Sequence, residues 1–302
     1  MANRFFTGAI MSLALATGSA LAADLPSLKA PPAYMPPPPM WTGFHVGLNA
    51  GGAWGASTAT NFASAPFLIN GADNVPWAAA MAIAGTGSLS TNNAGFIGGG
   101  QLGYDLQVSD RLLAGIETDV QGLAGAANNN AAAVTLSPTP LSSAGLNLLT
   151  SVASGKSLDF LGTVRGRLGY LITPTLLAYA TGGLAYGHAT STTSFFQHVP
   201  NDTPGFLLIG ASQGRFSDMR LGWTAGGGLE WMFWPQWSAK IEYLFYDLGV
   251  AAYPVAVTTD WHLTNLQVAS ATQARVRFDG HVVRAGVNYH FNWGAAPVVA
   301  KY

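Results

Sequence analysis

Residues 282–291 read Val-Val-Arg-Ala-Gly-Val-Asn-Tyr-His-Phe, and this stretch decides the fold. Apolar or aromatic residues occupy every second position, Val283 and Val287 among them. Polar or small residues such as Arg284 and Asn288 lie between them. A period of two is typical of a β-strand with one apolar and one polar face.

The same alternation recurs along the chain, with glycines on the polar face and aromatic residues on the apolar face. Strands are expected at about residues 41–55, 95–108, 112–121, 158–170, 176–188, 220–233, 237–246 and 275–291. In a membrane barrel the apolar face meets lipid and the interior is polar. We therefore predict an all-β fold, an eight-stranded antiparallel transmembrane β-barrel with long extracellular loops.

Short turns and long segments alternate between the expected strands. The turns are expected at residues 109–110, 173–174 and 234–236, and the long loops at about 57–93, 122–156, 189–217 and 249–274. In bacterial barrels the short turns face the periplasm and the long loops face outward. Both ends of the barrel are therefore expected on the periplasmic side.

The composition also favours a membrane barrel over a soluble domain. Charged residues make up 9% of the chain, whereas a soluble domain has about 25%. Hydrophobic residues reach 49%, yet no stretch beyond the N-terminal segment approaches the roughly 18 apolar residues of a membrane helix. A formal net charge of −1 predicts no nucleic-acid partner. The absence of cysteine excludes thiolate metal sites and a cysteine nucleophile.

The N-terminal segment has the pattern of a secretory signal peptide. Arg4 precedes a short apolar stretch at residues 5–15, and an Ala-Leu-Ala cleavage site ends at Ala22. This pattern predicts a signal peptide over residues 1–22, with cleavage between Ala22 and Ala23. We therefore expect export to the bacterial cell outer membrane.

The remaining chain is expected to have three parts. Residues 23–40 hold seven of the 17 prolines, a composition that favours extended polyproline II structure and cannot pair in a sheet. We interpret them as a periplasmic arm, more plausibly a spacer than a partner-binding segment. Residues 41–291 form the barrel, and residues 292–302 form a periplasmic C-terminal tail.

Two sets of residues are expected at defined places in the barrel. The first consists of charged residues on the polar face: Asp105, Glu117, Asp119, Asp159, Arg165, Arg167, Arg220, Glu230, Lys240, Glu242 and Arg284. A buried charge needs a partner, and eight strands leave just enough interior for side chains. We expect cross-barrel ion pairs that fill the interior, with a constricted conducting pore as the alternative. The second set brackets the short turns and resembles an aromatic girdle: Trp231, Phe233, Trp234, Trp237, Tyr289 and Phe291.

Three motifs associated with chemistry have simpler interpretations. Gly98–Gly103 satisfies G-x-G-x-x-G, but more strand follows where dinucleotide binding needs a helix. Gly210–Gly214 satisfies G-x-S-x-G around Ser212, yet it lies in an expected loop without a following helix. The histidines form no close ligand pair, although three could meet near the outer rim and bind a metal or haem: His188, His198 and His262. We expect no catalytic residue, no metal and no cofactor.

Both ends of the barrel carry a family likeness. The proline run with Trp41–Gly47 and the closing Gly286–Trp293 resemble the alphaproteobacterial outer-membrane β-barrel surface-protein family, also described as porin-like surface antigens. Residues 162–170 and 179–187 fit the same family, whereas the long loops do not. The resemblance implies a surface-exposed barrel of the kind formed by the membrane domain of OmpA, without shared catalytic residues.

These observations predict a structural or surface-interaction barrel that serves envelope integrity, adhesion or antigen display. The alternatives are a low-conductance porin for small solutes and, less favoured, an outer-membrane enzyme. The outer strand ends are rich in Gly, Ala and Thr, which argues against an enzyme. The expected partners are outer-membrane lipid, lipopolysaccharide and the outer-membrane assembly machinery. The sequence defines no oligomeric state.

Overall fold

The computed structural model describes residues 40–68, 75–91, 94–125, 128–136, 148–198, 209–261 and 266–291. The predicted signal peptide, its cleavage site at Ala22 and Ala23, and residues 292–302 lie outside the described residues, as does the proline-rich arm apart from Met40.

Eleven strands and one helix follow each other along the described chain. They are β1 (Gly43–Gly55), β2 (Ala59–Leu68), α1 (Val75–Ala84), β3 (Gly87–Ser90), β4 (Ala94–Gln107), β5 (Leu112–Ala124), β6 (Asn128–Leu136), β7 (Leu148–Thr173), β8 (Leu176–His198), β9 (Ile209–Trp234), β10 (Trp237–Trp261) and β11 (Leu266–Phe291). In the described residues no helix has the length and apolar character needed to cross a membrane.

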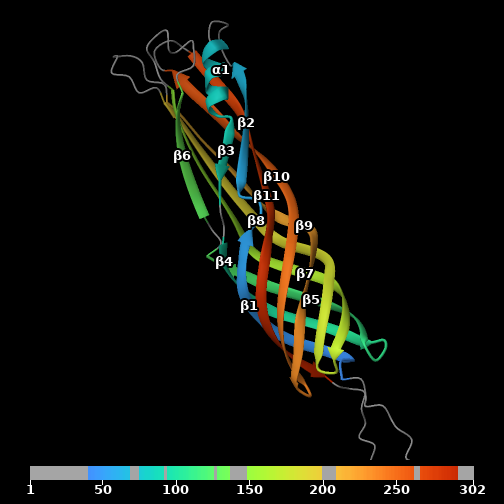
Figure 1. Ribbon diagram of the computed structural model, residues 1–302. Helices are drawn as coiled ribbons and strands as arrows, with labels where there is room; N and C mark the ends of the chain where they lie inside the picture. The colour runs from blue at the N-terminus through green and yellow to red at the C-terminus, as the bar shows by residue number, and fades with distance from the viewer. Residues whose placement is uncertain are drawn as a thin grey trace, which may run out of the picture. The chain divides into compact units, whose positions relative to one another are not determined.

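Eight of these strands close into a barrel, as the alternation predicts. Their order is β1, β4, β5, β7, β8, β9, β10 and β11, and every neighbouring pair is antiparallel. The closure is the pairing of β1 with β11, in which Phe44 lies opposite Phe291 and Trp54 opposite His281. The short turns and both barrel ends gather at one end of this cylinder, below the labels of β1 and β5 in Figure 1.

Alternate residues of each barrel strand face the interior and the outside. On β11, Arg284 is 1% exposed, whereas Val283 and Val287 are 39% and 44% exposed. Small residues make room for larger ones inside: a Cβ on Gly103 would lie 2.4 Å from the His45 ring, and one on Gly115 would lie 2.1 Å from Asp105 Oδ1. These glycines therefore accommodate two polar side chains of the interior.

Strands β7 to β11 are much longer than expected. They extend into the segments 122–156, 189–217 and 249–274, which the composition had assigned to loops. Residues 190–194 illustrate the reason for this correction: Ser191 and Thr193 are buried, while Ser194 faces outward. Threonine is a good strand former, so a Ser/Thr-rich strand that leaves the bilayer looks like loop sequence.

The expected loop at residues 57–93 is also largely ordered. It contains β2, α1 and β3, and β2 pairs with the upper part of β11 (Figure 1). Phe62 of β2 packs edge-on against Phe195 of β8, with ring centroids 5.3 Å apart. Gln197 Nε2 donates a hydrogen bond of 3.1 Å to the Met81 carbonyl of α1. The barrel wall thus continues beyond its transmembrane part and encloses a second, mainly apolar core.

A β-bulge interrupts the pairing of β7 with β8 between Leu158 and Leu161. Because the bulge shifts the side-chain alternation, Leu158 and Leu161 are both buried, and Asp159 points outward. The sequence had predicted an inward-facing Asp159. A prediction that assumes an unbroken alternation assigns each residue beyond the bulge to the wrong face of the strand.

Candidate functional site

The barrel interior holds a compact network of charged side chains. It consists of the expected residues except Asp159 and Arg220: Asp105, Glu117, Asp119, Arg165, Arg167, Glu230, Lys240, Glu242 and Arg284. We call this set the interior network. All of its members are at most 3% exposed.

Two arginines bind three carboxylates at the centre of the network. Arg165 on β7 donates to Glu117 at 2.5 Å, Asp119 at 2.8 Å and Glu242 at 2.9 Å. Arg284 on β11 donates to Asp119 at 2.9 Å and through Nε to Glu242 at 2.8 Å. Because β5, β7, β10 and β11 contribute these residues, the contacts join different parts of the wall across the interior.

A second group lies around Arg167. This guanidinium bonds to Glu230 and lies 3.3 Å from Asp105 Oδ2. Its Cζ lies 3.9 Å from the centroid of the Tyr179 ring. Glu117 connects the two groups, because its Oε2 lies 4.0 Å from Arg167 Nη1. Lys240 Nζ also donates to both Glu117 oxygens at 2.9 Å.

The network has one more acid than base. Its carboxylates are Asp105, Glu117, Asp119, Glu230 and Glu242, and its permanent cations are Arg165, Arg167, Lys240 and Arg284. The ring of His45 is 3.4 Å from Asp105 and 3.3 Å from Glu117, and that of His290 is 3.4 Å from Glu230. Both imidazoles are buried.

Apolar layers cover the interior network on both sides. Toward the short turns lie Trp41, Leu113, Leu171, Leu177 and Met232, and Trp41 Nε1 donates to the Pro174 carbonyl at 2.9 Å. The other side is closed by a larger cluster that includes Ile97, Leu161, Leu244, Phe278 and Val282. The charges are therefore enclosed in apolar surroundings, where each depends on its partners.

The structure does not place two expected members in the network. The Asp159 side chain is 56% exposed on the outer face, because the bulge in β7 reverses its direction. Arg220 is half-buried and donates to the carbonyls of Leu248 and Val250, at the irregularity of β10. A sequence pattern does not reveal either irregularity.

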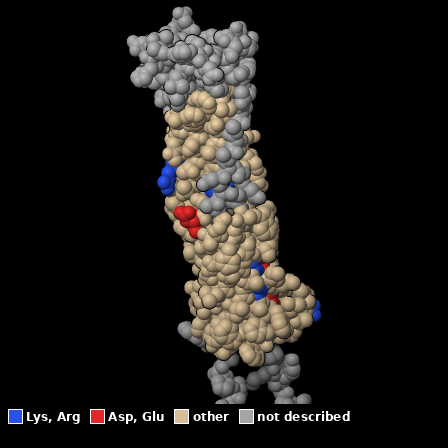
Figure 2. All heavy atoms as spheres, turned by 90° about the vertical axis from the view of Figure 1, so that its left-hand side faces the viewer, with Lys and Arg blue, Asp and Glu red and all other residues tan. Residues whose placement is uncertain are grey.

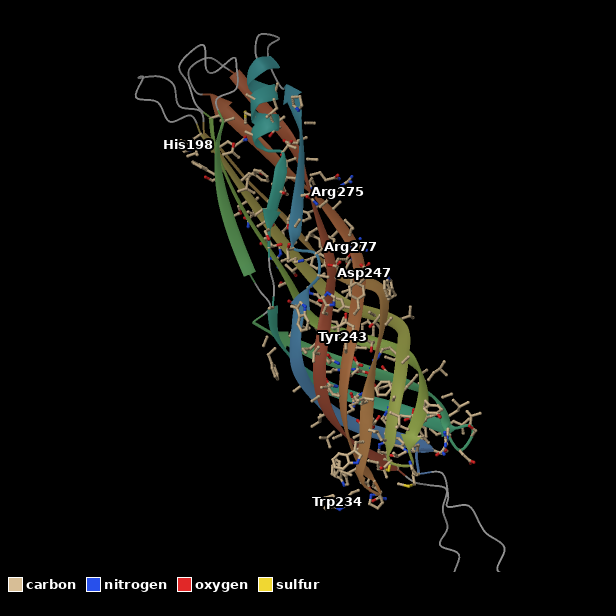
Figure 3. All side chains as sticks on the ribbon, viewed as in Figure 1. His198, Trp234, Tyr243, Asp247, Arg275 and Arg277 are labelled. Carbon is tan, nitrogen blue, oxygen red and sulfur yellow. The ribbon has the colours of Figure 1, made fainter. Side chains whose placement is uncertain are left out.

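The predicted girdle residues gather at the short-turn end on the outer face. Trp231, Trp234 and Trp237 are 55%, 67% and 42% exposed, and Trp237 packs against Tyr289. Figure 3 shows Trp234 at this end of the barrel.

A second aromatic belt, which was not predicted from the sequence, lies about ten residues further along the strands. Trp54, Tyr243 and Phe245 surround His281, with ring centroids 5.4–5.9 Å from it, and Trp223 packs on Phe245. A tilted membrane strand needs about 9–11 residues, so the two belts mark a membrane-spanning band. The exposed face in Figure 2 carries very few charged residues.

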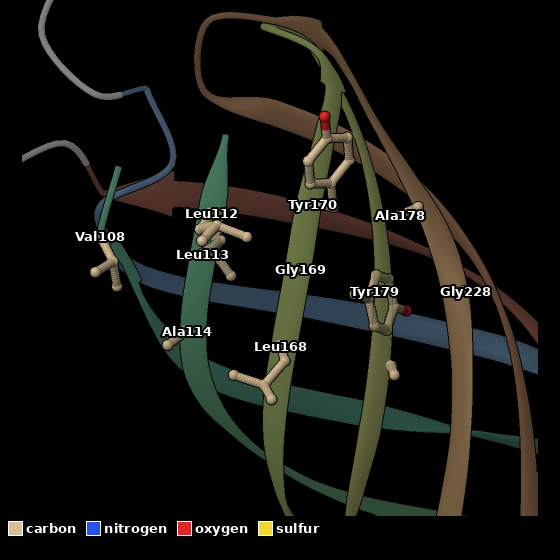
Figure 4. A pocket seen from close by; sticks show the side chains of 11 residues that line it. Val108, Leu112, Leu113, Ala114, Leu168, Gly169, Tyr170, Ala178, Tyr179 and Gly228 are labelled. Carbon is tan, nitrogen blue, oxygen red and sulfur yellow. The ribbon is translucent and has the colours of Figure 1, made fainter. Parts of the chain in front are cut away.

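The outer surface of the band also has one broad hollow at the short-turn end. It measures about 670 Å³ and lies over β5, β7 and β8, with Leu112, Leu168 and Tyr170 around it (Figure 4). These three residues are among the exposed large hydrophobics of the outer face. The buried side chains of Leu113 and Tyr179 also line the hollow, and Tyr179 contacts Arg167 of the interior network.

A further polar cluster lies beyond the second belt, and two of its members, Ser57 and Lys156, come from segments that the sequence had assigned to loops. Lys156 Nζ donates to the Ser57 carbonyl at 2.5 Å, and Asp279 accepts from the Ser57 amide and hydroxyl. Burial lowers the pKa of the Lys156 amine, against the opposing charge of Asp279. Arg277 pairs with Asp247 nearby, as Figure 3 shows. The extension of β7 places Lys156 in this cluster.

The three sequence motifs do not form catalytic or ligand sites of the kinds considered. Gly98–Gly103 lies inside β4, and the segment around Ser212 is strand β9 rather than the expected loop, so neither precedes a helix. His188 and His198 are far apart along β8, and His262 lies outside the described residues. Within the described ranges, no three His, Cys, Asp or Glu side chains are grouped as metal ligands.

Comparison with known proteins agrees with this architecture. Residues 12–291 match the family model of the outer membrane protein beta-barrel domain, so the chain belongs to this family. It is similar to the 31 kDa outer-membrane immunogenic protein of Brucella melitensis biotype 1, with 34% identity over 251 residues, covering 83% of this chain and 84% of the relative. The protein of the same name from Brucella suis biovar 1 has the same similarity. The protein is therefore an outer-membrane β-barrel protein.

Two solved structures match most of the chain at low TM-scores. OprG of Pseudomonas aeruginosa has a TM-score of 0.35 and 8% identity, covering 83% of this chain and 97% of its own. Neisserial surface protein A has a TM-score of 0.27 and 13% identity, covering 83% of this chain and 98% of its own.

Proposed function

We propose that this barrel is a structural and surface-interaction component of the outer membrane, serving envelope integrity, adhesion or antigen display. The filled interior is the observation that carries the proposal. The interior network lies between two apolar layers, an arrangement that favours mechanical stability over solute passage. The wall beyond the second belt offers a large surface for contact with other molecules.

The relative from Brucella supports the surface role, because its name describes an outer-membrane immunogenic protein. The partners that fit the proposal are membrane lipid and lipopolysaccharide around the apolar band. The outer-membrane assembly machinery would insert the barrel. No cofactor is part of this function.

Single-channel recording of the refolded protein in a planar bilayer tests the proposal. We expect current near the background of the protein-free bilayer. A steady, large open-channel current would contradict the proposal and favour the low-conductance porin alternative.

A second experiment addresses the surface role directly. Cells that lack the protein should become more sensitive to detergent or adhere less, and expression of the full chain should restore the lost property. If neither property changes, the proposed role is wrong, even if the single-channel recording shows no current.

A further inference from the structure

Three polar side chains on the outer face of the barrel form a chain of hydrogen bonds. His188 Nδ1 lies 2.7 Å from Asp159 Oδ2, and His188 Nε2 lies 3.2 Å from Ser217 Oγ. The residues come from the adjacent strands β7, β8 and β9. An imidazole with its proton on Nδ1 satisfies both contacts, since it donates to the carboxylate and accepts from the hydroxyl.

This is the bonding order of a Ser-His-Asp triad. In such triads the carboxylate orients the imidazole, and the imidazole takes the proton of the nucleophilic hydroxyl. The triad is recognised by these roles and not by the order of residues along the chain. We propose that Asp159, His188 and Ser217 form a serine acyl-transfer site that acts on membrane lipid esters.

The bulge in β7 creates this arrangement. It turns Asp159 to the outer face, toward His188 on the neighbouring strand. Bulges often redirect a side chain next to an active site. The side chains of Asp159 and His188 are 56% and 32% exposed, and Ser217 is also exposed, so a substrate can reach all three from outside.

The position of the site indicates its substrate class. On β9, the outward residues below Ser217 are apolar, with Met219 at 50%, Leu221 at 76% and Trp223 at 51% exposure. Above it, Arg215 and Gln213 are exposed. The site therefore lies beyond the second belt, at the loop-side border of the exposed apolar residues of β9. In the expected orientation this is the outer side of the membrane, where the headgroup region of the outer leaflet surrounds the barrel.

The reaction follows from the geometry. Ser217 Oγ attacks the ester carbonyl carbon while its proton moves to His188 Nε2, and the ester C–O bond then breaks as the leaving alcohol takes that proton. Water attacks the acylated Ser217 by the reverse proton path and releases the fatty acid. The hydroxyl of Thr190, 3.4 Å from Ser217 Oγ, is placed to donate to the carbonyl oxygen as it gains charge.

A fluorophosphonate probe tests the nucleophile in the refolded full chain. We expect labelling at Ser217, identified by mass spectrometry, and a loss on the order of 100-fold in Ser217→Ala and His188→Gln. Ser194→Ala is the matched control, because Ser194 is an exposed serine on the outer face of β8, and its labelling should match that of the unmutated protein. Labelling that persists in Ser217→Ala, or none in the unmutated protein, would overturn the proposal.

The positioning role of Asp159 and the substrate class have separate tests. Asp159→Asn should lower labelling, and Asp159→Glu should restore part of it, while both variants keep the electrophoretic shift of a folded barrel. Glycerophospholipid vesicles should release fatty acid with the unmutated protein but not with Ser217→Ala. Turnover of a soluble short-chain ester alone would overturn the assignment to a membrane lipid.

Discussion

Arg284 and Glu242 show how individual residues hold this barrel together. Arg284 is 1% exposed and lies between Glu242 and Asp119, while Glu242 also accepts from Arg165 and Tyr179. Neither charge has bulk water as an alternative partner. Such a network constrains its members together, because the loss of one leaves several others unpaired.

Breaking this pair should destabilise the barrel against urea in lipid. Glu242→Gln and Arg284→Met should each lower the free energy of unfolding by about 3–5 kcal/mol, since a buried charge loses its counter-charge. Residual water around these charges would make the loss in free energy of unfolding smaller. Arg275→Met is the control, because Arg275 is exposed and bonds only locally to Gln273; it should change stability by less than about 0.5 kcal/mol.

The double variant separates pairing from general damage. If Glu242 and Arg284 stabilise each other, their combined loss should cost less than the sum of the single losses. Simple additivity would argue that the two side chains act independently, against the contacts described above.

Position 287 tests the lipid-facing side of the same strand. Val287 lies outward within the band between the belts, so Val287→Arg should cost about 2–4 kcal/mol in a bilayer. Gln213→Arg, on the outer face beyond the band, should cost almost nothing. Equal stability of both variants and the unmutated protein would mean that the register of β11 is wrong.

At the scale of elements, the main feature is that β7 to β11 continue past the membrane band. Their free edges are partly covered, because β2 pairs with β11, β3 pairs with β2, and β6 pairs with β7. The rings of Phe62 and Phe195 and the helix α1 then close a core above the band. Within the bilayer, strands must pair because lipid offers no hydrogen bonds to the backbone. Beyond the bilayer, the paired edges and the shared apolar core stabilise these strands.

The orientation of these elements is testable with cysteines, since the chain has none of its own. Cysteine at Ser194 or Gln213, on the extended wall, should react with an impermeant reagent on intact cells. Cysteine at Ser109 or Gln236, in the short turns, should react only after the outer membrane is opened. The reverse pattern would place the short turns outside and would remove the outer-leaflet assignment of the Asp159–His188–Ser217 site.

At the scale of the barrel, the interior is closed by successive layers and not by one plug. Trp41 and its apolar neighbours lie at the short-turn end, the interior network follows, and the larger apolar cluster lies beyond it. We expect each layer alone to block the lumen. This redundancy means that the loss of one residue should not create a pore.

Trp41→Ala tests this redundancy. The substitution removes a side chain that is 1% exposed and the bond of its Nε1 to the Pro174 carbonyl. We expect a loss of about 3–5 kcal/mol of stability but no increase in single-channel current. A large current in Trp41→Ala would show that the apolar base alone closes the lumen.

Much of this protein follows from its sequence alone. Alternation with period two identified the barrel strands, and it distinguished Arg284 from Val287 because neighbouring strand residues face opposite sides. The same rule placed Arg165, Arg167 and Glu242 inside. A strand's two faces are a local property, so they can be read without knowledge of the other strands.

Only the tertiary structure decided the features that depend on pairing between strands. The sequence could not show that β7 bulges between Leu158 and Leu161, so it placed Asp159 inside and missed its contact with His188. It could not show that Ser/Thr-rich segments continue as strands, because hydrogen bonds from neighbouring strands stabilise them there. Which charges meet across the interior, and that Ser217 lies beside His188, likewise depend on register, which joins residues far apart in the chain.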